Sequence, residues 1–218
     1  MTKIFCDIAD INQIRVYNKK KIVMGFTTNP TLMRKAGAKD YLSYSKKILS
    51  ISYKKPVSLE VFADEPKDIK KQAFILNNLG KNVFVKIPVV NSKGLFLGKV
   101  IKELNKAKIK LNITAVYSDL QTKKILNCID NDTQVIISIF AGRMADVGKD
   151  PIPVFKNSIK LSKKFKSVKI LWASTREPYN FIQARQLGCH LITIPPSIIK
   201  KIENFGKSFE KLTKDTVL

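Results

Sequence analysis

One lysine of the chain stands out as a candidate nucleophile. Lys86 lies in the run Val83–Pro88, which is the most apolar setting of any lysine in the sequence. Holding a charged amine in such a setting is expensive, so the setting favours the neutral form. A neutral amine attacks a carbonyl carbon to give an imine. A lysine that ends an edge strand and reaches solvent would leave the same local pattern, so the residues around Lys86 must decide.

Two acids occupy comparable positions in the sequence. Asp7 follows the apolar run Lys3–Cys6, and Glu60 lies within the run Val57–Val61. These carboxyl groups could act as general acid and base, or one of them could neutralise Lys86. An acid at the end of a strand is also commonly a cap or a surface group, so its type alone does not assign it a role.

Three residues in the second half of the chain suit a phosphate group. Arg143 follows the sixth apolar run, and Ser174 and Arg176 follow the seventh. Arginine makes paired contacts with phosphate oxygens, and a serine hydroxyl can add a third. An isolated arginine more commonly forms a surface ion pair, so this interpretation requires the three to be close in space.

Short apolar runs that favour strands alternate with longer, lysine-rich segments patterned as helices. The predicted strands are Lys3–Cys6, Ile22–Phe26, Val57–Val61, Val83–Ile87, Ile109–Ile113, Gln134–Ile139, Val168–Trp172 and Leu191–Ile194. The predicted helices are Tyr41–Ile51, Pro66–Leu79, Gly94–Ala107, Ser118–Cys128, Pro153–Phe165, Glu177–Leu187 and Ser197–Leu212. Most of the strand candidates are almost continuously apolar, as strands buried on both faces are.

This alternation predicts an α/β fold with parallel strands and right-handed crossovers. Eight such units form a (β/α)8 TIM barrel, and we expect residues 1–218 to be a single barrel domain with an extra C-terminal helix. The rival is an open doubly wound sheet, which commonly carries a glycine-rich loop after its first strand. The segment Cys6–Asp10 contains no glycine, which favours the barrel.

The barrel prediction gathers the candidate residues in one place. Lys86, Asn112 and Ser138 recur at an interval of 26 residues, or one strand–helix unit. Residues at the carboxyl ends of barrel strands face the active-site mouth, so we expect a shared site although these residues are far apart in sequence.

Composition limits the alternatives. The net charge of +23 admits a basic nucleic-acid-binding barrel, but only five of the 40 basic residues are arginine and no aromatic residues interleave a basic stripe. We therefore expect no nucleic-acid partner. Three scattered cysteines without a CxxC spacing, and a single histidine, His190, predict free thiols and no metal site. Asp7 interrupts any signal-peptide core and no long apolar stretch follows, so we expect a cytoplasmic protein without membrane contact.

Seven segments together resemble the transaldolase family, in the short form that also includes fructose-6-phosphate aldolases. They are FCDIAD around Asp7, GFTTNPTL around Asn29, SLEVFA around Glu60, FVKIP around Lys86, LNITAVYS with Asn112 and Thr114, SIFAGR from Ser138 to Arg143, and WASTREP with Ser174 and Arg176. The resemblance covers almost the whole chain, and it implies sugar-phosphate substrates and no cofactor.

The resemblance also implies roles for individual residues. Lys86 would form the Schiff base, Asp7 would take a proton from the C4 hydroxyl, and Glu60 with Thr114 would hold a catalytic water. The remaining positions would bind substrate. The implied contacts to the dihydroxyacetone moiety come from Asn29, Asn112 and Ser138, and those to the phosphate from Arg143, Ser174 and Arg176. Thr28 and Phe140 are further implied substrate-binding positions.

Two positions separate the subgroups of the family. The fructose-6-phosphate aldolases resemble one another in having Gln where this chain has Glu60 and Tyr where it has Phe140. The resemblance therefore implies a transaldolase, with an aldolase that releases free dihydroxyacetone as the alternative. Short members commonly assemble as pentamers or decamers, which makes a homo-oligomer the expected state.

Overall fold

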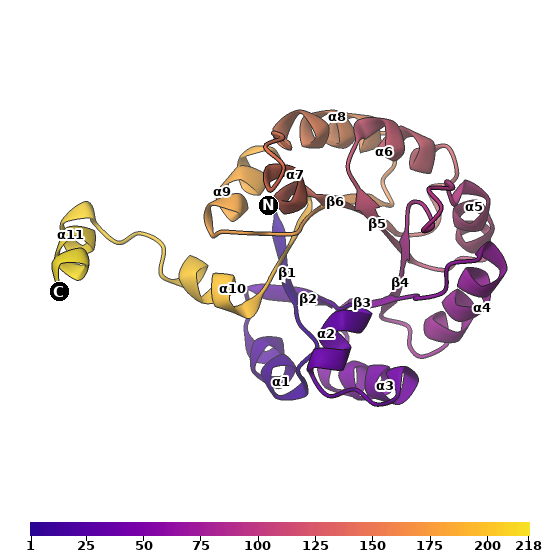
Figure 1. The fold of residues 1–218 in the computed structure, drawn as a ribbon, viewed down its shortest axis with the longest axis horizontal. Helices are drawn as coiled ribbons and strands as arrows, with labels where there is room; N and C mark the ends of the chain where they lie inside the picture. Colours follow the sequence, from indigo (N-terminus) through magenta and orange to yellow (C-terminus); the bar gives the residue numbers. More distant parts are fainter.

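Eight parallel strands close into a barrel, each strand pairing with its neighbours in sequence order. The computed structural model describes residues 1–218. Figure 1 looks along the barrel and shows the helices as an outer ring around the strands. This confirms the predicted (β/α)8 architecture. The strands are β1 (Lys3–Asp7), β2 (Val23–Thr27), β3 (Val57–Glu60), β4 (Val83–Pro88), β5 (Leu111–Val116), β6 (Val135–Phe140), β7 (Val168–Ala173) and β8 (Leu191–Ile194).

Eleven helices accompany the strands. Three of them, α1, α2 and α7, were not predicted from the apolar pattern. None of the helices combines the length and the apolar character that crossing a bilayer requires. The helices are α1 (Ile11–Lys19), α2 (Pro30–Lys35), α3 (Tyr41–Ser52), α4 (Pro66–Asn77), α5 (Gly98–Lys106), α6 (Asp119–Leu126), α7 (Ala141–Ala145), α8 (Ile152–Ser162), α9 (Tyr179–Gln186), α10 (Pro196–Glu203) and α11 (Phe209–Val217).

Two predicted helix boundaries were wrong, each for a local reason. The prediction began the fifth unit's helix at Gly94, but α5 begins at Gly98. The Asn91 side-chain oxygen accepts hydrogen bonds from the backbone N–H groups of Lys93 and Leu95, at 3.1 and 3.0 Å, and holds a turn there instead. The predicted last helix is two helices, because Gly206 adopts a φ of +93° between α10 and α11.

The apolar residues form two buried clusters. The larger one lies between the strands and the helices and holds bulky side chains such as Trp172, which stacks on Phe155 of α8 with ring centroids 4.4 Å apart. The smaller cluster has six buried members from β1, β4, β6, β7 and β8. It includes Phe5, two residues before Asp7, and Phe84, two residues before Lys86. Because side chains two apart point to the same face of a strand, this cluster lies beneath the candidate site.

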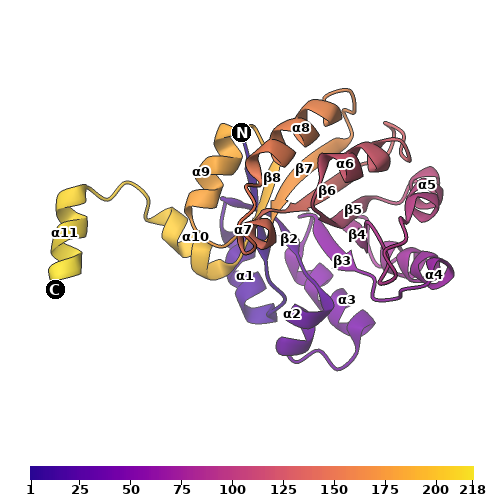
Figure 2. The same ribbon diagram turned by 45° about the horizontal axis from the view of Figure 1, so that its top comes forward.

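The last helix stands apart from the barrel. In both views an extended connection joins α10 to α11, which lies away from the strands and from the helical ring (Figure 1 and Figure 2). None of its residues is buried, although it carries apolar side chains. Phe209 and Val217 are 88% and 82% exposed. The barrel therefore closes without α11.

Candidate active site

A polar cavity of about 230 Å³ opens at the carboxyl ends of the strands. This mouth carries the active site in barrel enzymes of this architecture. Eleven of its thirteen lining residues are polar or charged. They are Asp7, Thr27, Asn29, Lys86, Asn112, Thr114, Ser138, Phe140, Arg143, Ala173, Ser174, Arg176 and Thr193.

Lys86 lies at the floor of this cavity and is buried. Its Nζ is 2.9 Å from Oε2 of Glu60, which is its register partner on β3. The amine also donates a hydrogen bond of 3.4 Å to the backbone carbonyl of Thr28. The two groups form an ion pair, so Lys86 must hand a proton to Glu60 or to water before its amine can attack a carbonyl. The sequence left open whether Asp7 or Glu60 would lie against Lys86, and the ion pair is made by Glu60.

Glu60 is held through its backbone by a residue that the sequence pattern did not point to. The Tyr41 hydroxyl at the start of α3 donates to the Glu60 carbonyl at 2.8 Å and accepts from the Glu60 N–H at 3.0 Å. Burial raises the pKa of Tyr41, which keeps this hydroxyl protonated. A tyrosine at a helix start has no distinctive spacing, so no sequence signal marks the contact.

Asp7 enters the cavity from the end of β1. Burial raises the pKa of its carboxyl group, while the positive charge of Lys86 and the hydrogen bond from Thr27 oppose this shift. The Thr27 hydroxyl donates to Asp7 Oδ1 at 2.7 Å and also lies within hydrogen-bond distance of the Thr193 hydroxyl. Because Thr27 has only one hydroxyl proton, Thr193 must be the donor in the second bond. Neither threonine was among the predicted site residues.

Asn112 is part of a row of side chains that crosses the cavity floor. Its Nδ2 donates to Ser58 Oγ at 2.9 Å, and its Oδ1 accepts from Ser138 Oγ at 2.6 Å. All three residues are buried. The amide keeps one N–H and one acceptor position for a ligand. Ser58 was missed, although it lies two residues before Glu60.

Thr114 brings an unsatisfied hydroxyl to the same floor. Its Oγ1 is buried and has no hydrogen-bond partner within the chain. Leaving such a group unpaired costs about 1–3 kcal/mol, so it favours a bound water or substrate oxygen. Asn29, at the edge of the cavity, caps α2 by accepting from Leu32 N–H at 2.8 Å, which leaves its side-chain N–H groups for a ligand.

Positive charge collects at the cavity rim. Arg176 Nε donates to Asp146 Oδ1 at 3.1 Å, and this carboxylate was not predicted. The Arg143 guanidinium lies over the Phe140 ring, 5.6 Å from its centroid. Ser174 has a φ of +62°, and a side chain at Gly142 would approach its carbonyl oxygen to 1.8 Å. The α7 helix, which carries Arg143, and the segment that carries Arg176 are thus packed closely, and only glycine fits between them.

Eleven of the twelve predicted site residues therefore meet at this mouth of the barrel. Ten of them line the cavity, and Glu60 joins them through its ion pair with Lys86. Thr28 differs, because its hydroxyl points to the Ser58 carbonyl at 2.9 Å and only its backbone oxygen contacts Lys86. His190 lies at the other end of the barrel and accepts a hydrogen bond from Ile170 N–H. No group of three or more His, Cys, Asp or Glu is arranged to hold a metal ion.

A closed parallel barrel with a lysine and two acids at its carboxyl-end mouth defines an enzyme of the (β/α)8 class. A family model described as transaldolase/fructose-6-phosphate aldolase matches residues 4–217. The chain belongs to this family.

Curated relatives share this similarity over nearly their full lengths. A probable transaldolase from Sulfurihydrogenibium sp. (strain YO3AOP1) is 37% identical over 203 residues, covering 92% of this chain and 88% of the relative. A probable transaldolase from Thermoplasma volcanium is 34% identical, covering 97% and 92%. Among solved structures, one provisionally assigned as a phosphonomutase from Burkholderia cenocepacia J2315 superposes with a TM-score of 0.62 at 9% identity, covering 98% of this chain and 94% of that one. This last likeness concerns the fold alone.

Proposed function

We propose that this protein is a Schiff-base transaldolase. It moves a dihydroxyacetone unit from a ketose phosphate, such as fructose 6-phosphate or sedoheptulose 7-phosphate, to an aldose phosphate. The observation that carries the proposal is the buried Lys86 amine, 2.9 Å from Glu60, on the floor of a polar cavity with arginines at its rim. Family membership supports the same reaction class.

The proposed reaction begins at Lys86. Glu60 accepts a proton from the ammonium group, and the free amine attacks the C2 carbonyl of the donor. Water leaves as the protonated imine forms, and a water held between Glu60 and Thr114 carries the protons. The unpartnered Thr114 hydroxyl supports this assignment. Asn29, Asn112 and Ser138 hydrogen-bond the hydroxyl groups of the dihydroxyacetone part.

Asp7 then acts on the substrate carbon chain. Its carboxylate takes the proton of the C4 hydroxyl, and the electron pair of the C3–C4 bond moves toward the imine. An aldose phosphate leaves, and the three-carbon unit remains on Lys86 as an enamine. The acceptor aldehyde is attacked by this enamine, the new hydroxyl recovers the proton from Asp7, and water releases the product. The protonated imine is the electron sink, so the scheme requires no cofactor.

Trapping the imine tests the proposal directly. The protein is incubated with fructose 6-phosphate and borohydride, and the modified peptide is mapped by mass spectrometry. An adduct on Lys86, together with transfer to erythrose 4-phosphate in a coupled assay, is the expected result. An unmodified Lys86 would remove the Schiff-base mechanism.

Replacing Arg176 by lysine is expected to raise KM for fructose 6-phosphate by about tenfold or more, because a lysine cannot make the paired contacts of a guanidinium. The measurement compares steady-state kinetics with fructose 6-phosphate and with unphosphorylated fructose. KM for fructose should be unchanged. Arg185→Lys on α9 is the matched control. Equal losses with both donors would argue against a phosphate contact.

An aldolase that releases free dihydroxyacetone is the second candidate, and Phe140 bears on it. Phe140 lines the cavity and contacts Tyr117 edge to face, with ring centroids 5.8 Å apart. It carries no hydroxyl that could protonate the enamine. Without that proton, the three-carbon unit stays on Lys86 until an acceptor aldehyde arrives, which favours transfer.

Phe140→Tyr is therefore expected to increase acceptor-independent release of dihydroxyacetone by about tenfold, because it introduces a general acid near the enamine. The measurement is dihydroxyacetone release from fructose 6-phosphate with and without erythrose 4-phosphate. Phe74→Tyr, at an exposed position on α4, is the control. Rapid acceptor-independent release by the unmodified protein would favour the aldolase instead.

We also propose a homo-oligomer, a pentamer or a decamer, in which α11 packs on a neighbouring copy. The exposed Phe209, Leu212 and Val217 support this proposal, since the barrel of the same chain does not cover them. Deleting residues 207–218 is expected to reduce the mass measured by sedimentation velocity to that of a smaller species. Replacing these three residues together by alanine should lower the measured mass in the same way, whereas Lys211→Ala should leave it unchanged. An unchanged mass after the deletion would refute a role for α11.

A further inference from the structure

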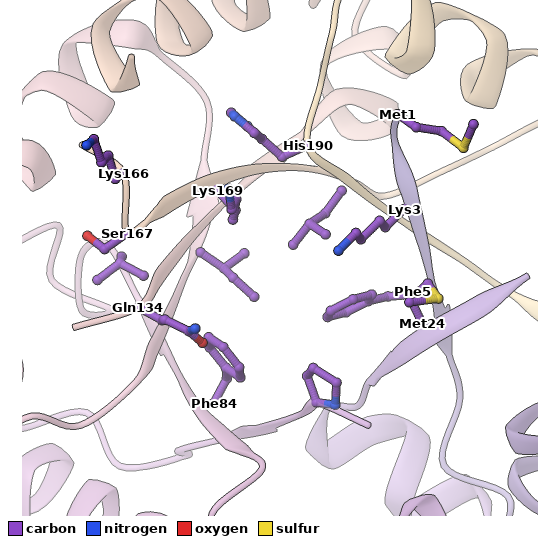
Figure 3. A pocket seen from close by; sticks show the side chains of 14 residues that line it. Met1, Lys3, Phe5, Met24, Phe84, Gln134, Lys166, Ser167, Lys169 and His190 are labelled. Carbon is purple, nitrogen blue, oxygen red and sulfur yellow. The ribbon is translucent and has the colours of Figure 1, made fainter. Parts of the chain in front are cut away.

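A second and larger cavity, of about 590 Å³, opens at the opposite end of the barrel. Its lining comes from the amino ends of six strands and from the segments that precede them, and it shares no residue with the cavity around Lys86. Figure 3 shows Lys3 reaching into this opening from β1, with the rings of Phe5 and Phe84 beneath it. Its volume lies within the range of about 300–1,000 Å³ that small-molecule sites occupy.

The charge of this cavity has one sign. Lys3, Lys166 and Lys169 line it, and no aspartate or glutamate does. None of these three lysines forms a salt bridge. All three lysines are exposed. Amines that line one cavity without a carboxylate repel one another, so an anion placed among them would be stabilised.

His190, the one histidine of the chain, is affected by the positive charge of this cavity. Burial lowers the pKa of His190, and the charge of Lys169 lowers it further. His190 is therefore neutral near pH 7. Its Nδ1 accepts from Ile170 N–H at 3.1 Å, so the ring proton is on Nε2. This nitrogen is a hydrogen-bond donor on a wall of the cavity.

The floor of the cavity is apolar and aromatic. Phe5 and Phe84 are buried members of the smaller cluster. A side chain at Gly25 would come within 2.7 Å of the Phe5 ring, so the glycine makes room for this ring. Besides the cations and His190, only Gln134 and Ser167 offer polar side chains in the lining. An apolar, aromatic floor covers a flat ring well, whereas a ligand made of sugar alone would find few hydrogen-bond partners here.

We propose that this cavity binds a phosphate monoester whose other part is a planar ring, with the size of a nucleoside monophosphate. The phosphate lies among Lys3, Lys166 and Lys169, and the ring lies against Phe5 and Phe84. The site is separate from the sugar-phosphate cavity and does not depend on the chemistry proposed there. The strands connect the two, because Phe84 lies two residues before Lys86 on the same face of β4.

Isothermal titration of the full-length protein with AMP, adenosine and inorganic phosphate tests the assignment. AMP is expected to bind with one site per chain and at least about tenfold more tightly than either fragment. Lys3→Gln combined with Lys169→Gln should weaken AMP binding by about tenfold or more. Lys156→Gln, an exposed lysine on α8 outside the cavity, is the control and should leave the affinity unchanged.

Three results would overturn the proposal. Phosphate that binds as tightly as AMP would leave no role for the aromatic floor. An equal loss of AMP affinity in Lys156→Gln would show that the overall positive charge, and not this cavity, attracts AMP. Displacement of AMP by fructose 6-phosphate in a competition titration would place AMP at the other mouth of the barrel. Because the double variant changes exposed residues only, its fold can be verified by an unchanged melting temperature.

Discussion

Replacing Lys86 by methionine is expected to reduce transfer by about 10⁴-fold or more and to eliminate the borohydride-trapped adduct. Methionine keeps the length and apolar character of the side chain but has no nucleophile. No other lysine lines the cavity at the carboxyl ends of the strands, so no substitute amine is available. The measurements are the coupled transfer assay and the mass of the protein after trapping with fructose 6-phosphate.

A second variant separates the nucleophile from the ion pair. Lys86→Met leaves the Glu60 carboxylate without its partner at 2.9 Å, which could disturb the site for electrostatic reasons alone. Lys86→Arg restores a positive charge beside Glu60 but cannot form the imine at neutral pH, because a guanidinium stays protonated. Both variants should be inactive, while Lys156→Met should keep full activity and its adduct. An adduct on another lysine in either variant would assign the nucleophile elsewhere.

The barrel was predictable because its signal repeats. Each of the eight strands is a short apolar run, and each predicted run overlaps its strand in the structure. The fifth strand shows what an apolar run does not predict. The run begins at Ile109, but the pairing of β5 with β4 and β6 begins at Leu111. Hydrophobicity reports burial, whereas register is set by the neighbouring strands, which no single run encodes.

The helices that were missed are short or capped by polar side chains. The α1 helix begins where Asp10 accepts a hydrogen bond from Gln13 N–H at 2.8 Å, and its apolar content is low. The α7 helix has five residues, fewer than a periodic pattern needs to be recognised. The break at Gly206 was visible in the sequence as a glycine, but apolar periodicity on both sides of it suggested one continuous helix.

The candidate site also contains residues that the sequence predicts and residues that it does not. Residues at strand ends were predictable because a barrel brings all such ends to one mouth, which is how Lys86, Asn112 and Ser138 were grouped. Residues that act through the backbone or through a second contact were not predictable. Tyr41 reaches Glu60 on β3 from the start of α3, and Asp146 reaches Arg176 across 30 residues of sequence. These contacts depend on how the loops pack, and the types of the residues do not reveal them.

Replacing Asp7 by asparagine is expected to lower the rate of transfer by about 10²–10⁴-fold while the trapped imine persists. The amide cannot take the C4 proton, whereas imine formation uses Lys86 and Glu60. Although the variant transfers more slowly, its folded state should be more stable at neutral pH than that of the unmodified protein. The pKa of Asp7 is raised in the folded protein, so between its ordinary value and its folded value the native state binds the proton more tightly, and stability falls as pH rises. At neutral pH the variant, which has no charge to bury, should therefore melt at a higher temperature than the unmodified protein.

The gain in stability should disappear at low pH, where Asp7 is protonated in both the folded and the unfolded chain. Thermal melts at pH 7 and below pH 4 measure this difference, and the trapping reaction measures imine formation in the same preparation. Thr27→Val is the matched control, because it keeps the carboxyl group but removes its hydrogen-bond donor at 2.7 Å. Loss of that bond should raise the pKa of Asp7 further and move the acid limb of the kcat/KM profile to higher pH. A loss of trapping in Asp7→Asn, or an acid limb that Thr27→Val leaves in place, would assign the C4 proton to a group other than Asp7.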